Sequence, residues 1–493
     1  MKILYLPLDS RPCNSIFPVQ MAEWAGAECL VPPREIMDRY TTPSSPEEIR
    51  RFLEQHAGEA DALVISADQL CFGGLLASRE ETVSLQEALS RLEILEKIHR
   101  EYPDRPIHAF SIILRSTIST LRKADIRVSL AVTAYSESSD RYAVLHREED
   151  RLRMEEAKTR IPPEVLRRVQ TVRRRNHELN LRCLEARRQG VLSSLSLLME
   201  DSQPYGFHRA EQRILKERMK GIPDTWLHNG TDEGGCTAMA RALSPEKQAA
   251  AIRWAGRTDG HFTAKYEDRP FEENLRDQLA CVRLEEKPEA ETVLVIAAPP
   301  DGRQEDLHAA SDGAIGEGLI RETAEECNRL MAEGRKVYLL DLLTTNGGSP
   351  RLLCAVHSGG LAGYSAWNTA SNALGTILAQ MVTDGLAGRP NIPFRNERFL
   401  DDMIYEGLIR RELDRELNAA GLDPYRLEDR PGGREEAERR IREMYGKLEK
   451  DPAFGEVLGA IRAAGPVSFS LPWGRTFEVQ AGNRNLKKVV ENC

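Results

Sequence analysis

Five segments of the chain repeat one pattern, in which an apolar, strand-like run stops at a cluster of polar and acidic residues. They read LYLPLDSRPCN at 4–14, ALVISADQLCFGGLLASR at 62–79, FSIILRS at 110–116, LSLLMEDSQPYG at 195–206 and WLHNGTDEGG at 226–235. In parallel α/β folds, ligands and catalytic groups lie at the carboxyl ends of buried strands. The repeated pattern therefore predicts one polar site built from several strand ends, and an enzyme.

Further strand-like runs continue the alternation of strands and helices. They lie at 27–33, 261–268, 291–302, 335–348 and 360–380. Helical segments separate most of these runs, which favours parallel pairing. About ten parallel strands are close to the number in a (β/α)8 barrel with extra strands. We therefore expect an α/β fold with a barrel-like core over residues 1–390, and two doubly wound parallel-sheet domains as the alternative.

Two segments depart from this alternation. Residues 117–190 are mostly charged and helix-like, with a break at Pro162-Pro163, and predict a helical arm inserted in the core. Residues 391–465 are again charged and helix-like, and VSFSLPWGRTFEVQ at 467–480 has the pattern of a β-hairpin. We therefore expect residues 391–493 to form an accessory unit.

Composition argues against several classes of protein. The 493 residues are 41% hydrophobic and 29% charged, as in soluble globular proteins, and the net charge of -9 argues against a nucleic acid as main partner. The nine cysteines contain no C-x-x-C pair, and Asp9 and Arg11 interrupt the first apolar run before a secretion signal could form. No stretch approaches the roughly eighteen apolar residues of a membrane span. We expect a cytoplasmic protein without nucleic-acid or membrane partners, and leave self-association open.

The run HNGTDE at 228–233 is the sharpest candidate for catalysis. Adjacent carboxylates on a strand point in different directions, so Asp232 and Glu233 can take separate roles if their environments split their pKa values. One would orient the substrate and the other would transfer a proton, which suits glycoside hydrolysis. The alternative is that the two acids cap the helix that follows.

Polar residues at other strand ends complete the predicted site. We expect the following residues to bind the substrate: Asp9, Arg11, Asn14, Asp68, Arg115, Glu200, Asp201, Asn229, Tyr364, Trp367 and Asn368. Aromatic rings with nearby amides are typical of sugar binding, so Tyr364, Trp367 and Asn368 favour a small carbohydrate as substrate; a buried core tryptophan is the alternative. Arg11, Arg79 and Arg115 could instead form a structural charge network that balances the acids.

The sequence lacks the usual metal-binding patterns. There is no H-E-x-x-H, no H-x-H and no cysteine–histidine cluster with zinc spacing, so we expect no dedicated metal site and no cofactor. A hydrolase or lyase that binds Mg²⁺ or Mn²⁺ through Asp9, Asp68, Asp201 and Asp232 is left open as a second hypothesis.

Six motifs in order resemble one bacterial family over nearly the whole chain, the family catalogued as domain of unknown function 4127. The motifs are LPLDSRPCN, ADQLCFGGLLASR, GTDEGG, KYEDRPFEE, GYSAWNTASNALGT and LPWGRTFEV. This resemblance implies little about activity, because the family name records no function.

The run HNGTDE is also similar to the H-x-G-G-D-E strand end of family 20 β-N-acetylhexosaminidases, with Thr231 in place of a glycine. In that family the Asp positions the acetamido group of the substrate and the Glu is the general acid. The resemblance implies these roles for Asp232 and Glu233, in an exo-acting enzyme with a substrate-assisted mechanism. A non-catalytic sugar-binding protein is the alternative from another class, because a fold does not guarantee chemistry.

Overall fold

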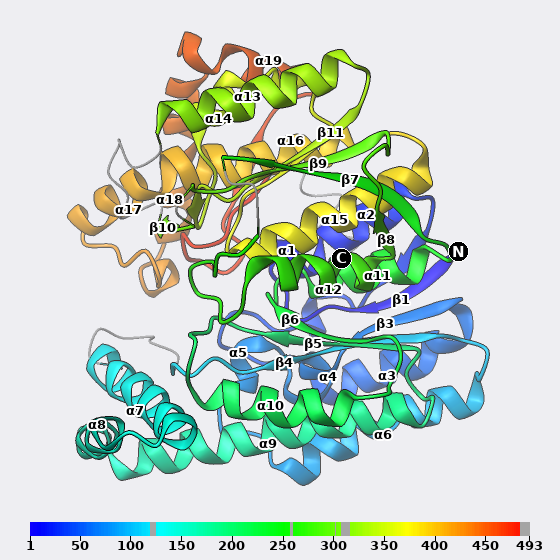
Figure 1. Ribbon diagram of the computed structural model, residues 1–493, viewed down its shortest axis with the longest axis vertical. Helices are drawn as coiled ribbons and strands as arrows, with labels where there is room; N and C mark the ends of the chain where they lie inside the picture. Colours follow the sequence, from blue (N-terminus) through cyan, green and yellow to red (C-terminus); the bar gives the residue numbers. More distant parts are fainter. Residues whose placement is uncertain (119–124, 257–259, 301, 307–315, 484–493) are drawn as a thin grey trace. The chain divides into compact units, whose positions relative to one another are not determined.

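The computed structural model describes residues 1–118, 125–256, 260–300, 302–306 and 316–483 (Figure 1). The chain forms two compact units, each assembled from separate segments of sequence. Unit 1 contains Met1–Ser10, Ala27–Ala242 and Tyr266–Arg269, and unit 2 contains Arg11–Gly26, Leu243–Lys265 and Pro270–Cys493.

Unit 1 is built on a six-stranded parallel sheet with the order β2-β1-β3-β4-β5-β6. In chain order the strands are β1 (Lys2–Leu6), β2 (Glu28–Leu30), β3 (Ala62–Ser66), β4 (Ile107–Ile113), β5 (Ser194–Met199) and β6 (Thr225–Asn229). Strands β3, β4 and β5 are buried along their whole length. Continuous apolar runs of this kind are expected for parallel strands that are covered on both faces.

Helices cover both faces of this sheet. The helices of unit 1 are α3 (Pro46–His56), α4 (Ala67–Phe72), α5 (Leu75–Ser78), α6 (Leu85–Glu101), α7 (Asp125–Leu145), α8 (Glu148–Thr159), α9 (Pro163–Arg188), α10 (Phe207–Met219) and α11 (Gly234–Leu243). Helices α3, α6, α9 and α10 lie on one face of the sheet (Figure 1), and their apolar side chains share one core cluster with the strands. On the other face, α11 begins so close to β4 and β5 that a Cβ on Gly234 would meet Leu198 and Phe110.

The segment between β4 and β5 is helical, as the sequence predicts for residues 117–190, although residues 119–124 lie outside the described chain. Pro163 occupies the first turn of α9, where its missing N–H and fixed φ are tolerated. Helices α7 and α8 pack against one another, whereas α9 packs against α6, β4 and β5. The expected arm is therefore a pair of helices, and α9 belongs to the layer that covers the sheet.

Unit 2 is built on a second parallel sheet, of five strands with the order β13-β11-β9-β7-β8. Its strands are β7 (Gln248–Ala255), β8 (Leu284–Glu286), β9 (Thr292–Ala297), β11 (Lys336–Asp341) and β13 (Gly363–Ser365). Read from its first strand, this sheet has the same order as the first five strands of unit 1: the second strand lies on one side of the first, and the later strands on the other. This is the order of a doubly wound fold, in which ligands bind where the order reverses.

The helices of unit 2 enclose its sheet and the C-terminal segment. They are α1 (Pro12–Ser15), α2 (Phe17–Trp24), α12 (Phe271–Val282), α13 (Glu317–Ala332), α14 (Pro350–Ala355), α15 (Ala370–Ala387), α16 (Ile392–Arg398), the π-helix η4 (Phe399–Ile409), α17 (Arg410–Ala419), α18 (Gly433–Leu448) and α19 (Gly455–Ala463). Two short parallel strands, β10 (Glu305–Asp306) and β12 (Thr344–Thr345), pair beside this sheet. Helices α13 and α15 lie on opposite faces of the five-stranded sheet (Figure 1).

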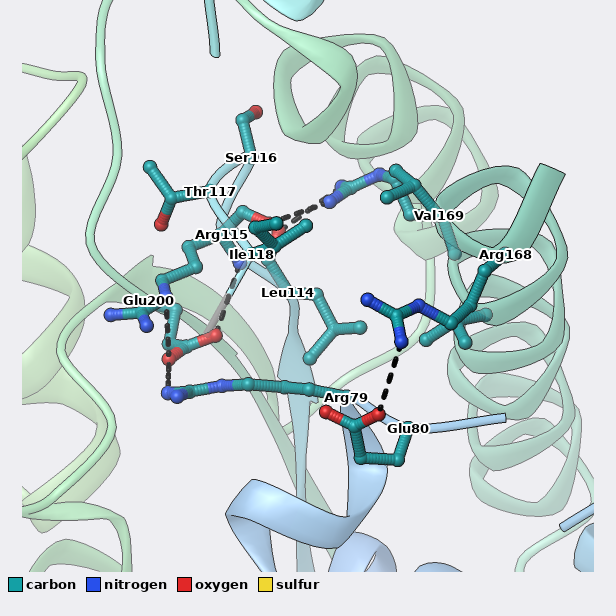
Figure 2. A pocket seen from close by; sticks show the side chains of 12 residues that line it. Arg79, Glu80, Leu114, Arg115, Ser116, Thr117, Ile118, Arg168, Val169 and Glu200 are labelled. Atoms are coloured by element: carbon teal, nitrogen blue, oxygen red, sulfur yellow. Dashed lines mark hydrogen bonds and ion pairs between the residues drawn. The ribbon is translucent and has the colours of Figure 1, made fainter. Parts of the chain in front are cut away.

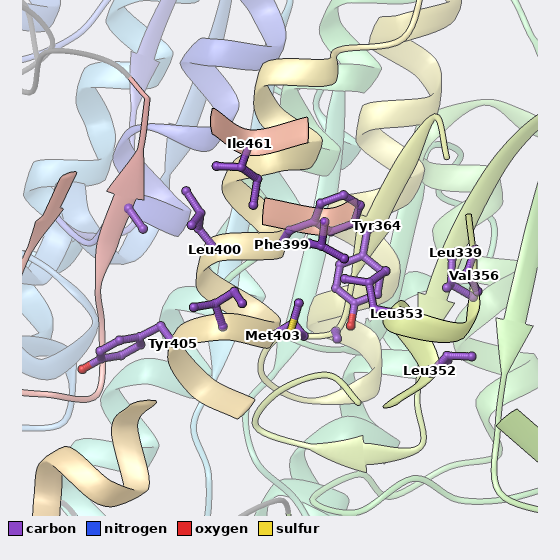
Figure 3. Packing of buried hydrophobic residues seen from close by; sticks show 14 of the residues in the cluster. Leu339, Leu352, Leu353, Val356, Tyr364, Phe399, Leu400, Met403, Tyr405 and Ile461 are labelled. Carbon is purple, nitrogen blue, oxygen red and sulfur yellow. The ribbon is translucent and has the colours of Figure 1, made fainter. Parts of the chain in front are cut away.

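The C-terminal segment packs into the same core as the second sheet. Strands β14 (Ser468–Ser470) and β15 (Gln480–Gly482) pair in antiparallel fashion, as the hairpin pattern predicts. Side chains of η4, α14 and α19 meet Leu339 and Tyr364 of the sheet in one apolar cluster (Figure 3). The segment expected to be an accessory unit, residues 391–493, is thus part of unit 2 as far as it is described.

The predicted α/β class is confirmed, but the described strands do not form a closed barrel. They form two open parallel sheets, which is the arrangement named as the alternative. Alternating strands and helices are common to both architectures, and only the pairing of the strands distinguishes them. Two predicted strands also differ from the structure. Residues 261–268 are irregular, with Tyr266 at φ 65°, and the strand in this region is β7. In the run at 360–380, only Gly363–Ser365 is a strand, and the rest of the run enters α15.

No disulfide joins the described cysteines, which exclude Cys493. Within the described ranges, no helix has both the length and the apolar character needed to cross a lipid bilayer.

A buried charge cluster of unit 2 offers a test of the fold. Arg398 Nη1 lies 2.9 Å from Asp401 Oδ2 and 2.8 Å from Asp402 Oδ1, and all three side chains are buried. Removing one partner of a buried ion pair leaves an uncompensated charge, so we expect Arg398→Met to lower the free energy of unfolding by about 3–5 kcal/mol. The shift of the urea midpoint measures this loss. The exposed Arg411 on α17 is the control, and Arg411→Met should change stability by less than about 0.5 kcal/mol; equal effects of both changes would contradict the assignment.

Candidate functional site

Three neighbouring strands of unit 1 bring predicted site residues to one edge of the sheet. Strands β4, β5 and β6 pair in parallel register, with Ile113 opposite Met199 and Met199 opposite Asn229. Glu200 follows β5 directly, and Arg115 follows β4 after one residue. These residues therefore lie together at the carboxyl edge of the sheet, where polar groups of parallel α/β folds collect.

Glu200 lies between two arginines at this edge. It forms an ion pair with Arg79, which ends the short helix α5, and its Oε2 accepts the backbone N–H of Arg115 over 3.1 Å (Figure 2). The Arg115 guanidinium lies 3.9 Å from Glu200 and 3.4 Å from Asp201. Burial opposes the ionisation of Glu200, but the two arginines outweigh it and hold its pKa below the ordinary value. Glu200 is therefore ionised at neutral pH.

Glu233 lies in the turn between β6 and α11 and is fully buried. Its carboxyl group occupies the space where a Cβ on Gly230 would lie, and its Oε1 is 3.7 Å from His228 Nδ1. Gly230 has φ 97°, a left-handed conformation that glycine adopts without strain. Burial raises the pKa of Glu233 well above its usual value, and repulsion from Asp232 and Glu267 adds to the shift. This carboxyl therefore keeps its proton to a higher pH than an ordinary glutamate.

The other predicted residues at the ends of β5 and β6 differ in their exposure. Asn229 is buried and donates from Nδ2 to Ser202 Oγ over 2.9 Å. Asp232 is 5% exposed and shares the turn with Glu233. The side chain of Asp201 is 48% exposed, so Asp201 is the most accessible of these strand-end acids.

Asp68 lies in the first turn of α4, directly after β3. Its Oδ2 accepts the N–H of Ile112 over 2.8 Å and the hydroxyl of Ser111 over 3.3 Å, and both donors belong to β4. The side chain is fully buried, and burial raises the pKa of Asp68 to about 7. In unit 1, Asp68 therefore joins α4 to β4.

The three polar residues predicted at the end of the first strand belong to different units. Asp9 is buried in unit 1, whereas Arg11 and Asn14 belong to unit 2, at and within α1. The Arg11 guanidinium lies 3.9 Å from Glu478 and 5.2 Å from the centre of the Trp473 ring. Arg11 therefore forms a cation–π contact within unit 2.

Buried carboxylates of unit 2 accept hydrogen bonds from the two aromatic residues predicted to bind a sugar, Tyr364 in β13 and Trp367 shortly after it. The hydroxyl of Tyr364 donates to Asp341 Oδ2 over 3.2 Å, and its ring lies in the apolar core (Figure 3). The backbone N–H of Trp367 donates to Asp402 Oδ2 over 3.1 Å. The backbone carbonyl oxygen of Asn368 accepts the N–H of Asn346 over 2.8 Å. Both rings are buried, which agrees with the alternative interpretation of Trp367 as a core residue.

A pocket of about 50 Å³ opens beside the ion pairs of Glu200 (Figure 2). Four of its lining residues are arginines and two carry hydroxyl groups: Arg79, Arg115, Arg168, Arg173, Ser116 and Thr117. Two acidic residues, Glu80 and Glu200, also line it. Cations and hydroxyl donors outnumber carboxylates, so the pocket suits a polar ligand with negative or developing negative charge.

Some residues of this edge are not indicated by the sequence patterns. Arg79 is predicted only as part of a structural charge network that balances the acids, and its ion pair with Glu200 fits that prediction. Ser116 ends the run FSIILRS, and His208 follows the run at 195–206, but neither position alone indicates a role. Asp268 lies in a segment predicted as a strand. The side chains of Ser116, His208 and Asp268 meet only after folding.

The described part of the chain contains no cluster of three or more His, Cys, Asp or Glu side chains arranged to hold a metal ion. The four aspartates named as ligands in the second hypothesis, Asp9, Asp68, Asp201 and Asp232, are therefore not gathered into such a cluster.

A family model described as "Protein of unknown function (DUF4127)" matches residues 3–482. The chain belongs to this family. The match agrees with the six motifs found in the sequence, and it covers both units. No curated protein matches the chain.

The buried carboxyl group of Asp68 predicts a specific pH dependence of stability. Its pKa is about 7 in the folded protein and about 3.9 in an unfolded chain, so between these values the folded state holds a proton that the unfolded state releases. The stability that Asp68 contributes is therefore complete below about pH 4 and lost as the pH rises through about 7. We expect Asp68→Asn to flatten this decline, and thermal midpoints between pH 4 and 8 measure it. Parallel curves for the two proteins would contradict the prediction, and the exposed Asp104→Asn serves as control.

Proposed function

We propose that this protein is a glycoside hydrolase whose general acid is Glu233 in unit 1. The observation that carries the proposal is a pair of buried acids, on adjacent strand ends, whose pKa values shift in opposite directions. Burial raises the pKa of Glu233. At Glu200, the charges of Arg79 and Arg115 outweigh the effect of burial and lower the pKa. One protonated and one ionised carboxyl group are what glycoside hydrolysis requires.

The most specific form of the proposal is an exo-β-N-acetylhexosaminidase. In this form Glu233 protonates the leaving glycosidic oxygen, while Asp232 orients the acetamido group of the substrate as its oxygen attacks the anomeric carbon. The similarity of HNGTDE to family 20 enzymes and the shared turn of Asp232 and Glu233 support it. Because Glu233 is fully buried, this mechanism requires the turn at 230–233 to open when substrate enters.

A panel of nitrophenyl glycosides tests the proposal and separates its two forms. Turnover restricted to N-acetylhexosaminides supports the substrate-assisted form with Asp232. Turnover of sugars that lack the acetamido group favours Glu200 as the second carboxylate. Folded protein that cleaves no glycoside in a broad panel contradicts the proposal, and binding of a sugar without turnover indicates a sugar-binding protein.

Glu233→Gln is the decisive substitution. It keeps the shape and hydrogen bonding of the side chain but removes the transferable proton, so we expect turnover to fall roughly 10²–10⁴-fold. The thermal midpoint at neutral pH should change little, because a neutral amide replaces a carboxyl whose raised pKa favours the neutral form. Substrates with a strongly acidic leaving group should lose less, since they need less protonation.

Asp150→Asn is the matched control, because Asp150 is also a fully buried carboxylate but belongs to the α7–α8 pair. Its Oδ1 accepts a charged hydrogen bond from Arg141 Nε over 2.8 Å. Loss of this pair should lower the thermal midpoint and leave the rate per folded molecule unchanged. If Glu233→Gln behaves in the same way, Glu233 is a structural residue.

A further inference from the structure

A chain of hydrogen bonds in unit 1 runs through two serines and ends on a histidine. The Phe207 N–H donates to Ser136 Oγ over 2.8 Å, and Ser136 Oγ donates to Ser116 Oγ over 2.9 Å. Ser116 Oγ lies 2.8 Å from His208 Nδ1. A backbone N–H can only donate, so Ser136 Oγ accepts from Phe207 and donates its own hydrogen to Ser116 Oγ. The proton of Ser116 is therefore directed at His208.

The other ring nitrogen of His208 fixes its tautomer. Nε2 lies 2.8 Å from the carbonyl oxygen of Gln203, which can only accept, and 3.6 Å from Asp268 Oδ2. The backbone nitrogen of Gln203 lies 3.4 Å from Nε2, and this contact is weaker than the 2.8 Å contact with the Gln203 carbonyl oxygen. Nε2 therefore carries the hydrogen, and Nδ1 presents its lone pair to Ser116. Burial lowers the pKa of His208 to about 4, against the attraction of Asp268, so the ring is neutral at neutral pH.

Asp268 is itself held in place beside the histidine. Gln212 Nε2 donates to Asp268 Oδ2 over 2.6 Å, and Arg209 lies 3.6 Å from the same oxygen. A nucleophile that donates to a base, with the base oriented by a third group, is the general arrangement of an activated serine. Here the Gln203 carbonyl oxygen orients the ring through a hydrogen bond, and the nearby Asp268 charge favours its protonated form.

Ser116 is also placed where a small molecule can reach it. It is partly exposed and lines the pocket of about 50 Å³. Ser116 lies at the edge of this pocket, and its hydroxyl points away from Arg79 and Glu200 (Figure 2). The neighbouring Gly206 has no Cβ, and one placed there would lie 2.8 Å from Ser116 Oγ and from His208 Nδ1. One water molecule needs about 10–15 Å³ of such a pocket. The pocket thus has room for a few non-hydrogen atoms, such as an acetyl group.

We infer that Ser116 is a nucleophile for the transfer of a small acyl group, with His208 as its general base and Asp268 as the anion that stabilises the protonated ring. Ser116 Oγ attacks the carbonyl carbon of an ester and its proton passes to His208 Nδ1. The bond to the alcohol oxygen then breaks, and that oxygen takes the proton from His208. In the second half-reaction, water attacks the acyl-serine and gives one proton to the same nitrogen. The bond to Ser116 Oγ then breaks, Oγ takes that proton back from His208, and the carboxylic acid leaves.

The arginines of the pocket can stabilise the charge that develops on the carbonyl oxygen. Arg115 and Arg173 reach the pocket from β4 and α9, and both are within unit 1. Positive groups fixed near a developing oxyanion lower the barrier to acyl transfer. This chemistry is separate from glycoside cleavage at Glu233 and does not depend on it.

Labelling with a fluorophosphonate probe tests this inference on the full chain, because such probes modify activated serine hydroxyls. We expect stoichiometric labelling of the peptide that contains Ser116, identified by mass spectrometry, and faster hydrolysis of nitrophenyl acetate than of the octanoate. Ser116→Ala should abolish both. His208→Gln should slow labelling of Ser116 by roughly 10²–10⁴-fold, the usual contribution of a general base.

Ser138→Ala is the matched control, because Ser138 is a buried serine on α7, like Ser136, and does not line the pocket. This variant should label at the rate of the unchanged protein. Asp268→Asn provides a second variant if His208→Gln does not fold, and it should slow labelling as well. The inference is overturned if the folded protein leaves Ser116 unlabelled, or if His208→Gln and Asp268→Asn both label Ser116 at the unchanged rate. The network is then a structural link between α7 and α10. Neither result depends on turnover of a glycoside.

Discussion

The parallel alignment of strands within each unit constrains where the polar groups of this chain can lie. A strand covered by helices on both faces leaves no place for a charged side chain along its length. Charged residues can therefore lie only at the ends of such a strand, and parallel pairing places all the carboxyl ends on one edge. In unit 1 this constraint brings Arg115, Glu200 and Asn229 to the ends of three adjacent strands.

Burial at that edge gives chemically similar side chains different properties. Glu200 and Glu233 are both buried, but the pKa of Glu200 is lowered by Arg79 and Arg115, whereas burial and two nearby carboxylates raise the pKa of Glu233. Burial raises the pKa of Asp68 to about 7, although backbone and hydroxyl donors to its carboxylate favour ionisation. The proposed role of Glu233 as a general acid rests on this difference of environment rather than on residue type.

The two units share a strand order that no repeat in the sequence indicates. In each sheet the second strand lies on one side of the first and the later strands on the other. The sequence shows alternating strands and helices, and this pattern fits a single barrel as well as two sheets. Hydrogen bonding between strands decides between them, and it involves residues far apart in the chain, such as Ile3 with Ala62 and Leu195 with Thr225.

The sequence by itself determined the α/β class, the strand ends that carry acids, the helical segment before β5 and the C-terminal hairpin, because local periodicity and turn residues encode these features. It misplaced the strand at 261–268, since the short run there has the composition of a strand but ends in a turn at Tyr266. Only the tertiary structure decided that Arg79 pairs with Glu200, that Tyr364 and Trp367 are buried, and that Ser116, His208 and Asp268 lie side by side. The physical reason is that these contacts join residues from separate elements, and a local pattern carries no information about which elements pack together.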